Sequence, residues 1–250
     1  MWFWPFTREK TYKEAGLLNG MTDWHTHILP GVDDGVANMD DAVKTLKQYS
    51  HMDIREVWLT PHINVDMPNE TDVLRKRFDE LQQVYQNFEH SSEHHLVKIH
   101  LGGEYMLDSL LLERLCKRDI LTLGDDTHLL LQLGIANQPE KLSDKIREIL
   151  NVGYVPVLAH PERYLYMSRS DYHTLRKDMS VEFQLNLPSL VGLYGPEAMR
   201  RAKMLLEAGY YTYVGSDLHN LHKFYAAITE YKISTKHIEL LREIVDSTAK

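Results

Sequence analysis

Two histidines separated by one residue, His25 and His27, are the first side chains in this chain with the chemistry of a metal site. On an extended strand, residues i and i+2 point to the same face, so both imidazoles would enter one pocket. A turn with a proline and a glycine follows, and then two adjacent carboxylates, Asp33 and Asp34. Imidazoles and carboxylates without a thiolate suit zinc, manganese or iron. The pair alone is a weak signal, and the prediction depends on ligands elsewhere.

Imidazole or carboxylate side chains also mark the ends of four later predicted strands. The eight candidate metal ligands are His25, His27, Asp34, His62, Glu104, His160, Asp217 and His219. Any one of them alone is typical of an ordinary polar residue near a strand end. A barrel, however, would bring the carboxyl ends of its strands into one bowl. Eight ligands are too many for one tetrahedral ion and indicate two or three metals with bridging carboxylates.

The elements that would position these residues alternate along the chain. Strands are predicted at 22–28, 54–60, 96–104, 128–133, 155–163, 181–186 and 211–219. Helices are predicted at 38–49, 72–88, 109–117, 143–151, 172–179, 196–208 and 234–247. This alternation predicts an α/β fold with a parallel sheet closed by crossover helices, most simply a TIM-like barrel. We expect one domain over residues 21–250, after an N-terminal extension of residues 1–20.

Composition narrows the function and the location. The net charge of −8 over 250 residues argues against nucleic-acid binding as the main role. The single cysteine, Cys116, permits no disulfide within the chain, which fits a reducing cytoplasm. We find no apolar run long enough for a transmembrane helix. The aromatic N-terminus, residues 1–6, is followed by basic residues and would either contact a membrane surface or a partner, or pack on its own domain.

The stretch from His25 to Gly35, HTHILPGVDDG, resembles the opening of the PHP (polymerase and histidinol phosphatase) superfamily. More narrowly, it resembles the bacterial tyrosine phosphatases of capsule and exopolysaccharide clusters, the CpsB/YwqE group. The resemblance runs from about residue 22 to the C-terminus. It continues through TPH at 60–62, GGEY at 102–105, LAHPERY at 158–164, QLN at 184–186 and SDLHN at 216–220.

This resemblance implies the PHP fold, a distorted barrel of about seven βα units, with a trinuclear centre that often holds manganese. Iron, zinc or cobalt are the other candidates, with two or three divalent ions bound. It implies hydrolysis of phosphotyrosine on the tyrosine-rich tail of a bacterial kinase that controls polysaccharide export. Metal ions at such a site can lower the pKa of water to about 7 and present hydroxide to phosphorus.

Individual roles follow from the same resemblance. Four side chains match the ligands of one metal: His25, His27, Glu104 and Asp217. Glu104 also bridges to a second metal, which His160 binds. Three side chains match the ligands of the third: Asp34, His62 and His219. Arg163 matches the arginine that grips the phosphate, and its alternative is a salt bridge at the barrel rim, for example to Glu162. Asp34 is chosen over Asp33 because of the family's spacing.

Departures from the family leave other functions open. Gln132 stands where the family commonly has glutamate, and Gly103 replaces a usual alanine. A glutamine there could alter metal loading, so a regulator that binds the kinase tail without turnover is one alternative. A phosphatase for a small phosphoester such as histidinol phosphate is another. A thiol phosphatase needs an arginine six residues after its cysteine, and Cys116 has Thr122 there. An oligomer is compatible with the sequence.

Overall fold

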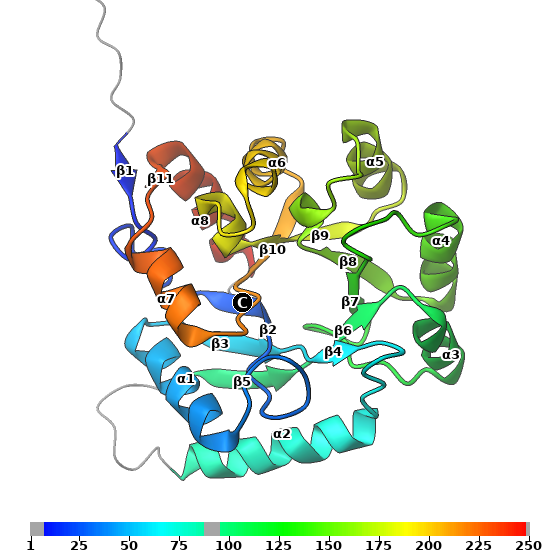
Figure 1. Ribbon diagram of the computed structural model, residues 1–250, viewed down its shortest axis with the longest axis horizontal. Helices are drawn as coiled ribbons and strands as arrows, with labels where there is room; N and C mark the ends of the chain where they lie inside the picture. Colours follow the sequence, from blue (N-terminus) through cyan, green and yellow to red (C-terminus); the bar gives the residue numbers. More distant parts are fainter. Residues whose placement is uncertain (1–7, 88–95, 249–250) are drawn as a thin grey trace, which may run out of the picture.

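The computed structural model describes residues 8–87 and 96–248 as a set of parallel strands surrounded by helices (Figure 1). The strands are β2 (Thr22–Thr26), β3 (Glu56–Leu59), β4 (His62–Ile63), β5 (Lys98–Leu101), β6 (Glu104–Met106), β7 (His128–Gln132), β8 (Val155–Ala159), β9 (Glu182–Asn186) and β10 (Tyr211–Gly215). The helices are α1 (Met39–His51), α2 (Thr71–Gln86), α3 (Ser109–Lys117), α4 (Leu142–Val152), α5 (Arg169–His173), α6 (Pro196–Glu207), α7 (Leu221–Thr229) and α8 (Thr235–Thr248). The predicted alternation of strands and helices is therefore present.

The strands form two parallel sheets rather than one closed barrel. One sheet has the order β10-β9-β8-β7-β6-β4, and the other has the order β2-β3-β5. A single bridge between Thr26 and Leu218 joins β2 to the segment after β10. The α/β class is thus as predicted, but the described strands show no closed barrel.

Two breaks at the same level separate the sheets: one follows the predicted strand at 54–60, and the other interrupts the predicted strand at 96–104. Pro61 lies between β3 and β4, and a proline has no backbone N–H to donate to a neighbouring strand. Gly102 lies between β5 and β6, where an added Cβ would be 2.9 Å from a methyl of Leu123. A side chain here would force Leu123 and Thr60 to shift, so glycine suits this close approach. A predicted ligand follows each break: His62 is the first residue of β4, and Glu104 is the first residue of β6.

Helix α7 and the short strand pair were not predicted. Asn220 caps α7 by accepting a hydrogen bond from the backbone N–H of Lys223, and Phe224, Ala227 and Ile228 form its buried face. This cap and this spacing were visible in the sequence as helix signals. Strands β1 (Glu9–Lys10) and β11 (Ile233–Ser234) pair antiparallel. Each has two residues, which is too short to produce a sequence pattern.

The described part of the predicted extension packs on the fold. Tyr12, Leu17 and Leu18 are buried, and the Tyr12 hydroxyl donates to the Leu187 carbonyl at 2.8 Å. The aromatic residues 1–6, predicted to touch a membrane or to pack on the domain, lie outside the described residues. Among the described residues, no helix has both the length and the apolar character needed to cross a bilayer.

Candidate metal centre

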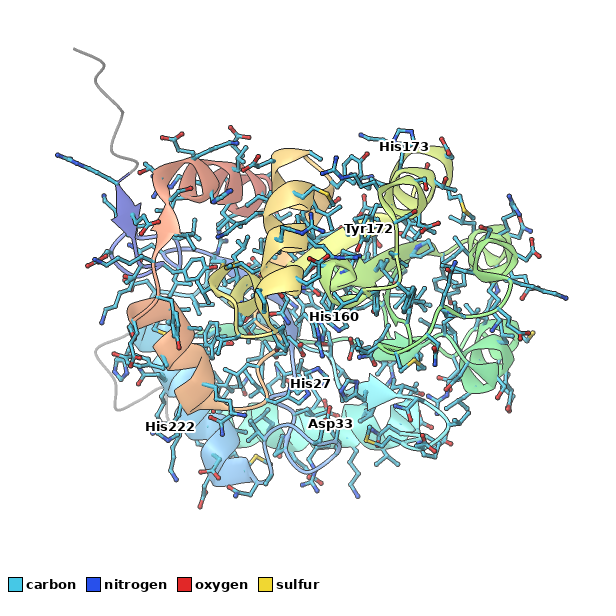
Figure 2. All side chains as sticks on the ribbon, turned by 45° about the horizontal axis from the view of Figure 1, so that its top comes forward. His27, Asp33, His160, Tyr172, His173 and His222 are labelled. Carbon is cyan, nitrogen blue, oxygen red and sulfur yellow. The ribbon has the colours of Figure 1, made fainter. Side chains whose placement is uncertain are left out.

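The structure brings all eight predicted ligands together where the strands end. They come from β2 and the loop after it (His25, His27, Asp34), from the starts of β4 and β6 (His62, Glu104), and from the residues after β8 and β10 (His160, Asp217, His219). Figure 2 shows His27 and His160 toward the middle of the molecule, whereas His173 and His222 lie at its outside. The strand-end pattern thus identified a real cluster of imidazoles and carboxylates.

The most buried group joins His25, His27, Glu104 and Asp217. The Nε2 atoms of His25 and His27 are 3.1 Å apart. They lie 3.4 and 3.7 Å from the two carboxylate oxygens of Glu104. They lie 3.7 and 3.4 Å from Asp217 Oδ1. Burying these imidazole nitrogens and carboxylate oxygens so close together would be costly without an ion between them. The geometry therefore suits a divalent cation that all four side chains bind.

His160 approaches the same carboxylate from the other side. Its Nε2 lies 3.2 Å from Glu104 Oε1, and its buried Nδ1 has no hydrogen-bond partner among the described residues. Burial and the nearby Arg163 lower the pKa of His160 to about 4. The ring is therefore neutral, which is the form that binds a metal. Nε2, the ring nitrogen that faces Glu104, is the one that would bind the metal.

A third group lies nearer the surface. The exposed carboxylate of Asp34 has its Oδ1 3.5 Å from His62 Nε2 and 3.3 Å from His219 Nε2. His62 also reaches Glu104, with Nδ1 2.7 Å from Oε2. His27 lies between this group and the buried one, because ring nitrogens of His27, His62 and His219 all lie within 4.8 Å of one another. The donor atoms therefore form one continuous cluster.

Asp33, the neighbour of Asp34, lies behind the cluster instead of in it. Its Oδ2 accepts hydrogen bonds from His27 Nδ1 at 2.7 Å and from the His62 backbone N–H at 3.1 Å. Burial raises the pKa of Asp33, but the bond and charge of His27, together with the backbone N–H groups of Gly35 and His62, lower the pKa overall. A carboxylate on one ring nitrogen holds the other toward a metal. Spacing alone could not assign the two carboxylates to these different positions.

Other orienting residues were also missed in the sequence. Gln184 Oε1 lies 2.8 Å from His25 Nδ1, the ring nitrogen that faces away from the cluster. Asn186 Nδ2 donates to Asp217 Oδ2 at 2.9 Å. Both residues belong to β9, in the motif QLN, which had been noted only as part of the resemblance. Amides at strand ends carry no distinctive signal, so only the fold could assign them.

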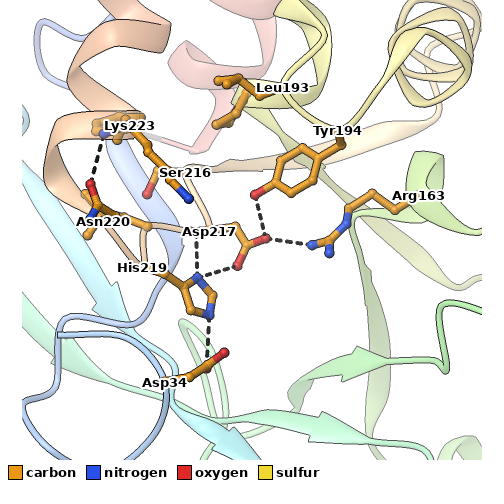
Figure 3. A pocket seen from close by; sticks show the side chains of 12 residues that line it. Asp34, Arg163, Leu193, Tyr194, Ser216, Asp217, His219, Asn220 and Lys223 are labelled. Carbon is orange, nitrogen blue, oxygen red and sulfur yellow. Dashed lines mark hydrogen bonds and ion pairs between the residues drawn. The ribbon is translucent and has the colours of Figure 1, made fainter. Parts of the chain in front are cut away.

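Arg163 bonds to Asp217 and not to Glu162. Its Nη1 donates to Asp217 Oδ2 at 2.8 Å, and Tyr194 donates its hydroxyl to the same oxygen at 3.3 Å (Figure 3). Asp217 Oδ1 remains directed at the histidines. Although burial raises the pKa of Asp217, the surrounding histidines, with His27 foremost, hold it well below its usual range. Asp217 is therefore an anion that links the arginine to the cluster.

Two of the proposed ligands have strained backbones. His160 and Asp217 have φ angles of +36° and +52°, a region that non-glycine residues adopt rarely and at a cost on the order of 1–2 kcal/mol. At Gly35, an added Cβ would lie 2.2 Å from the His27 carbonyl oxygen. The loop from Asp33 to Gly35 can thus fold back onto β2 only with glycine at this position.

A cavity of about 520 Å³ opens beside the cluster. Its polar lining residues are Asp34, Arg163, Ser216, Asp217, His219, Asn220 and Lys223. Its apolar lining residues are Pro188, Leu193, Tyr194, Leu218 and Phe224. The cavity could therefore hold a ligand that has both an anionic group and an apolar group.

Two further residues from the sequence analysis have clear positions. Gln132 is the last residue of β7, where its carbonyl accepts a hydrogen bond from the Leu107 backbone N–H. Cys116 is an exposed residue of α3 and does not line the cavity. The helical context predicted for Cys116 is confirmed, and nothing around it forms an anion-binding loop of the thiol phosphatase kind.

Comparisons with known proteins identify the family of this chain. The chain is similar to the tyrosine-protein phosphatase YwqE of Bacillus subtilis, with 29% identity over 207 residues, 80% of this chain and 78% of YwqE. It is similar to CpsB of Streptococcus pneumoniae, with 27% identity over 210 residues, 80% of this chain and 84% of CpsB. The fold matches a chain from the crystal structures of YwqE from Bacillus subtilis and CpsB from Streptococcus pneumoniae, which are described as unique metal-dependent tyrosine phosphatases. The match has a TM-score of 0.76 and 25% sequence identity, and it covers 92% of both chains. The family model for capsular polysaccharide synthesis, CpsB/CapC, matches residues 21–239, and the chain therefore belongs to the CpsB/CapC family.

Proposed function

We propose that this chain is a metal-dependent protein-tyrosine phosphatase that acts on a bacterial tyrosine kinase controlling capsule or exopolysaccharide synthesis. The relatives are named tyrosine-protein phosphatases, and the family is one of capsular polysaccharide synthesis. The observation that carries the proposal is the position of Arg163, which bonds to Asp217 of the ligand cluster and lies against the ring of Tyr194, an apolar lining residue of the cavity. A phosphate held at Arg163 would have its ester group near that ring.

The eight clustered side chains would hold the metal ions. His25, His27, Glu104 and Asp217 would bind one ion, and Glu104 with His160 would bind a second. Asp34, His62 and His219 would bind the third. The donor set of imidazoles and carboxylates and the short distance from His160 Nε2 to Glu104 support this assignment. Manganese is the proposed metal, and iron, zinc or cobalt would suit the same donors.

Bound divalent ions would lower the pKa of water and stabilise negative charge on phosphoryl oxygens. In the hydrolysis, a water oxygen bonds to phosphorus, the ester P–O bond breaks, and the tyrosine phenol leaves with a proton. Arg163 uses Nη1 on Asp217, so its remaining N–H groups can hold a phosphoryl oxygen. Its bond to Asp217 keeps the guanidinium beside the ligands, where the charge of the transferring group develops.

Gln132 would weaken metal loading at the second position. That position has Glu104 and His160 as ligands, and Gln132 ends the strand paired with the one that carries Glu104. A neutral amide binds a divalent ion less strongly than a carboxylate does. Occupancy of this position would therefore depend on metal concentration more than occupancy of the buried position does.

The fold, domain, partner and location that we propose are those expected from the family. The two sheets would correspond to the distorted barrel of the PHP fold, in a single domain that spans residues 21–250. The partner would be the phosphotyrosine tail of the kinase. The proposed location is the cytoplasm, where the free thiol of Cys116 would remain reduced.

Metal analysis combined with turnover tests the function. Purified protein should contain two or three divalent ions per chain, and it should release phosphate from a phosphotyrosine peptide. A chelator should abolish the release, and Mn²⁺ should restore it. Faster turnover of histidinol phosphate than of the peptide would favour the small-phosphoester alternative. Bound metal without any turnover would favour a regulator that only binds the kinase tail.

A further inference from the structure

The segment that follows η4 (Leu187–Val191) presents two apolar side chains at the cavity mouth. Gly192 and Gly195 flank Leu193 and Tyr194, and both glycines have left-handed φ angles, +85° and +93°. The Gly195 N–H donates to the Gly192 carbonyl at 3.0 Å, which closes a tight turn before α6 begins at Pro196. The backbone of this turn requires glycine at both ends, so the two residues between them are held in one direction.

Leu193 and Tyr194 remain exposed although they are large and apolar, with 42% and 37% of their surfaces accessible. Other exposed hydrophobic residues, such as Val73 and Leu165, lie outside the cavity, whereas these two line it. The apolar residues beside them in the cavity, Leu218 and Phe224, are buried. Exposed apolar surface at a cavity mouth costs free energy that a ligand can recover by covering it.

Tyr194 is fixed in place by contacts with Arg163 and Asp217. Its ring lies over the guanidinium of Arg163, with 4.3 Å from Cζ to the ring centroid. Its hydroxyl donates to Asp217 Oδ2 at 3.3 Å (Figure 3). These two contacts set the plane of the ring and leave Leu193 beside it at the open side of the cavity. Apolar surface therefore begins directly at the cation that would hold a phosphate.

We propose that Leu193 and Tyr194 form the surface that contacts the aromatic ring of a phosphotyrosine, and that they select aryl phosphates over alkyl phosphates. The inference rests on the proposed function, because it assumes that Arg163 holds the phosphate. A phenyl group attached to that phosphate would cover the exposed faces of both side chains. A short alkyl group would leave most of this surface in water and gain less.

Binding of two stable phosphonates tests the selectivity without requiring turnover. Calorimetry on the Mn²⁺-loaded protein would compare phenylphosphonate with ethylphosphonate. The wild-type chain should bind the phenyl compound about tenfold more tightly, as expected for an aromatic ring that covers apolar surface. Leu193→Ser should reduce this ratio severalfold while changing the affinity for ethylphosphonate little. Because Leu193 is exposed, this variant should fold normally.

Three further variants distinguish a loss of contact with the phenyl ring from a general loss of structure. Tyr194→Phe keeps the ring and should keep the phenyl preference, whereas Tyr194→Ser should lose it. Leu165→Ser removes a more exposed leucine outside the cavity and should leave both affinities unchanged. A wild-type protein without phenyl preference, or a Leu193→Ser variant that retains it, would overturn the inference.

Failure of the proposed function would look different. A protein that binds phenylphosphonate preferentially through Leu193 but hydrolyses no phosphotyrosine peptide would contradict the enzyme and leave the ring-contact surface standing. A protein that hydrolyses the peptide but shows no phenyl preference would contradict only the ring-contact surface.

Discussion

Asp33 Oδ2 lies 2.7 Å from His27 Nδ1, and this contact ties the loop after β2 to the centre of the ligand cluster. The same oxygen accepts the backbone N–H of His62, and Asp33 Oδ1 accepts the backbone N–H of Gly35. One buried carboxylate therefore sets the ring of one proposed ligand and the backbone of another. The two neighbouring aspartates have separate tasks, since Asp34 faces His62 and His219 from the exposed side.

Asp33→Asn should weaken metal binding without removing a ligand. The amide is neutral and presents its oxygen less strongly to His27, so the ring is held less firmly toward the metal. Loss of such an outer carboxylate typically costs roughly 10–100-fold in metal affinity. A metal titration followed by calorimetry measures this change, and circular dichroism checks the fold. Unchanged affinity would mean that His27 needs no orienting partner.

Asp217→Ala and His160→Ala should each abolish phosphotyrosine hydrolysis. Each variant removes a proposed buried ligand, and the loss of the charges that stabilise a transition state costs on the order of 10³-fold or more. Elemental analysis should find less metal per chain, while the circular dichroism spectrum should match the wild type. Wild-type turnover in either variant, measured with Mn²⁺ in excess, would show that the ligand assignment is wrong.

Arg163→Lys should lower kcat/KM for a phosphotyrosine peptide about 100-fold. Lysine keeps the positive charge but lacks the planar fork that can bond Asp217 and a phosphoryl oxygen together. The metal content should stay the same, because Arg163 is not a ligand. If the metal content fell along with the activity, Arg163 would act mainly by positioning Asp217.

Glu162 should make the stability of the metal-free protein depend on pH. This carboxyl group is fully buried, where it accepts the Asn186 N–H at 3.1 Å and the Tyr211 hydroxyl at 2.9 Å, and burial raises its pKa to about 7. In the unfolded chain the pKa is about 4.3, so the folded state binds the proton more tightly. The stabilisation is complete below pH ~4 and is lost as the pH rises through about 7.

Glu162→Gln should remove this part of the pH dependence. The difference in pKa corresponds to roughly 4 kcal/mol of unfolding free energy between pH ~4 and pH ~8. Urea unfolding of the chelator-treated proteins measures it, and Glu148→Gln, an exposed change in α4, is the control. Equal slopes in wild type and Glu162→Gln would contradict the raised pKa.

The sequence by itself determined the chemistry of the site and the order of its elements. Imidazoles and carboxylates at strand ends are local patterns, and so is the alternation of strands and amphipathic helices. All eight predicted ligands and Arg163 therefore came together as expected, because parallel strands place their carboxyl ends at one edge. Helix α7 was missed although Asn220 and Phe224 signalled it.

Only the tertiary structure decided how these residues are oriented. The close approach at Gly102 depends on Leu123, which is distant in sequence, and the break it marks separates the strands into two sheets. Asp33 and Asp34 are chemically identical, and they differ only because the loop folds back so that one meets His27 and the other faces the cavity. Arg163 bonds to Asp217, 54 residues away, instead of to adjacent Glu162, which is buried against Tyr211. Such partners are set by packing between distant segments, which no local pattern of the sequence encodes.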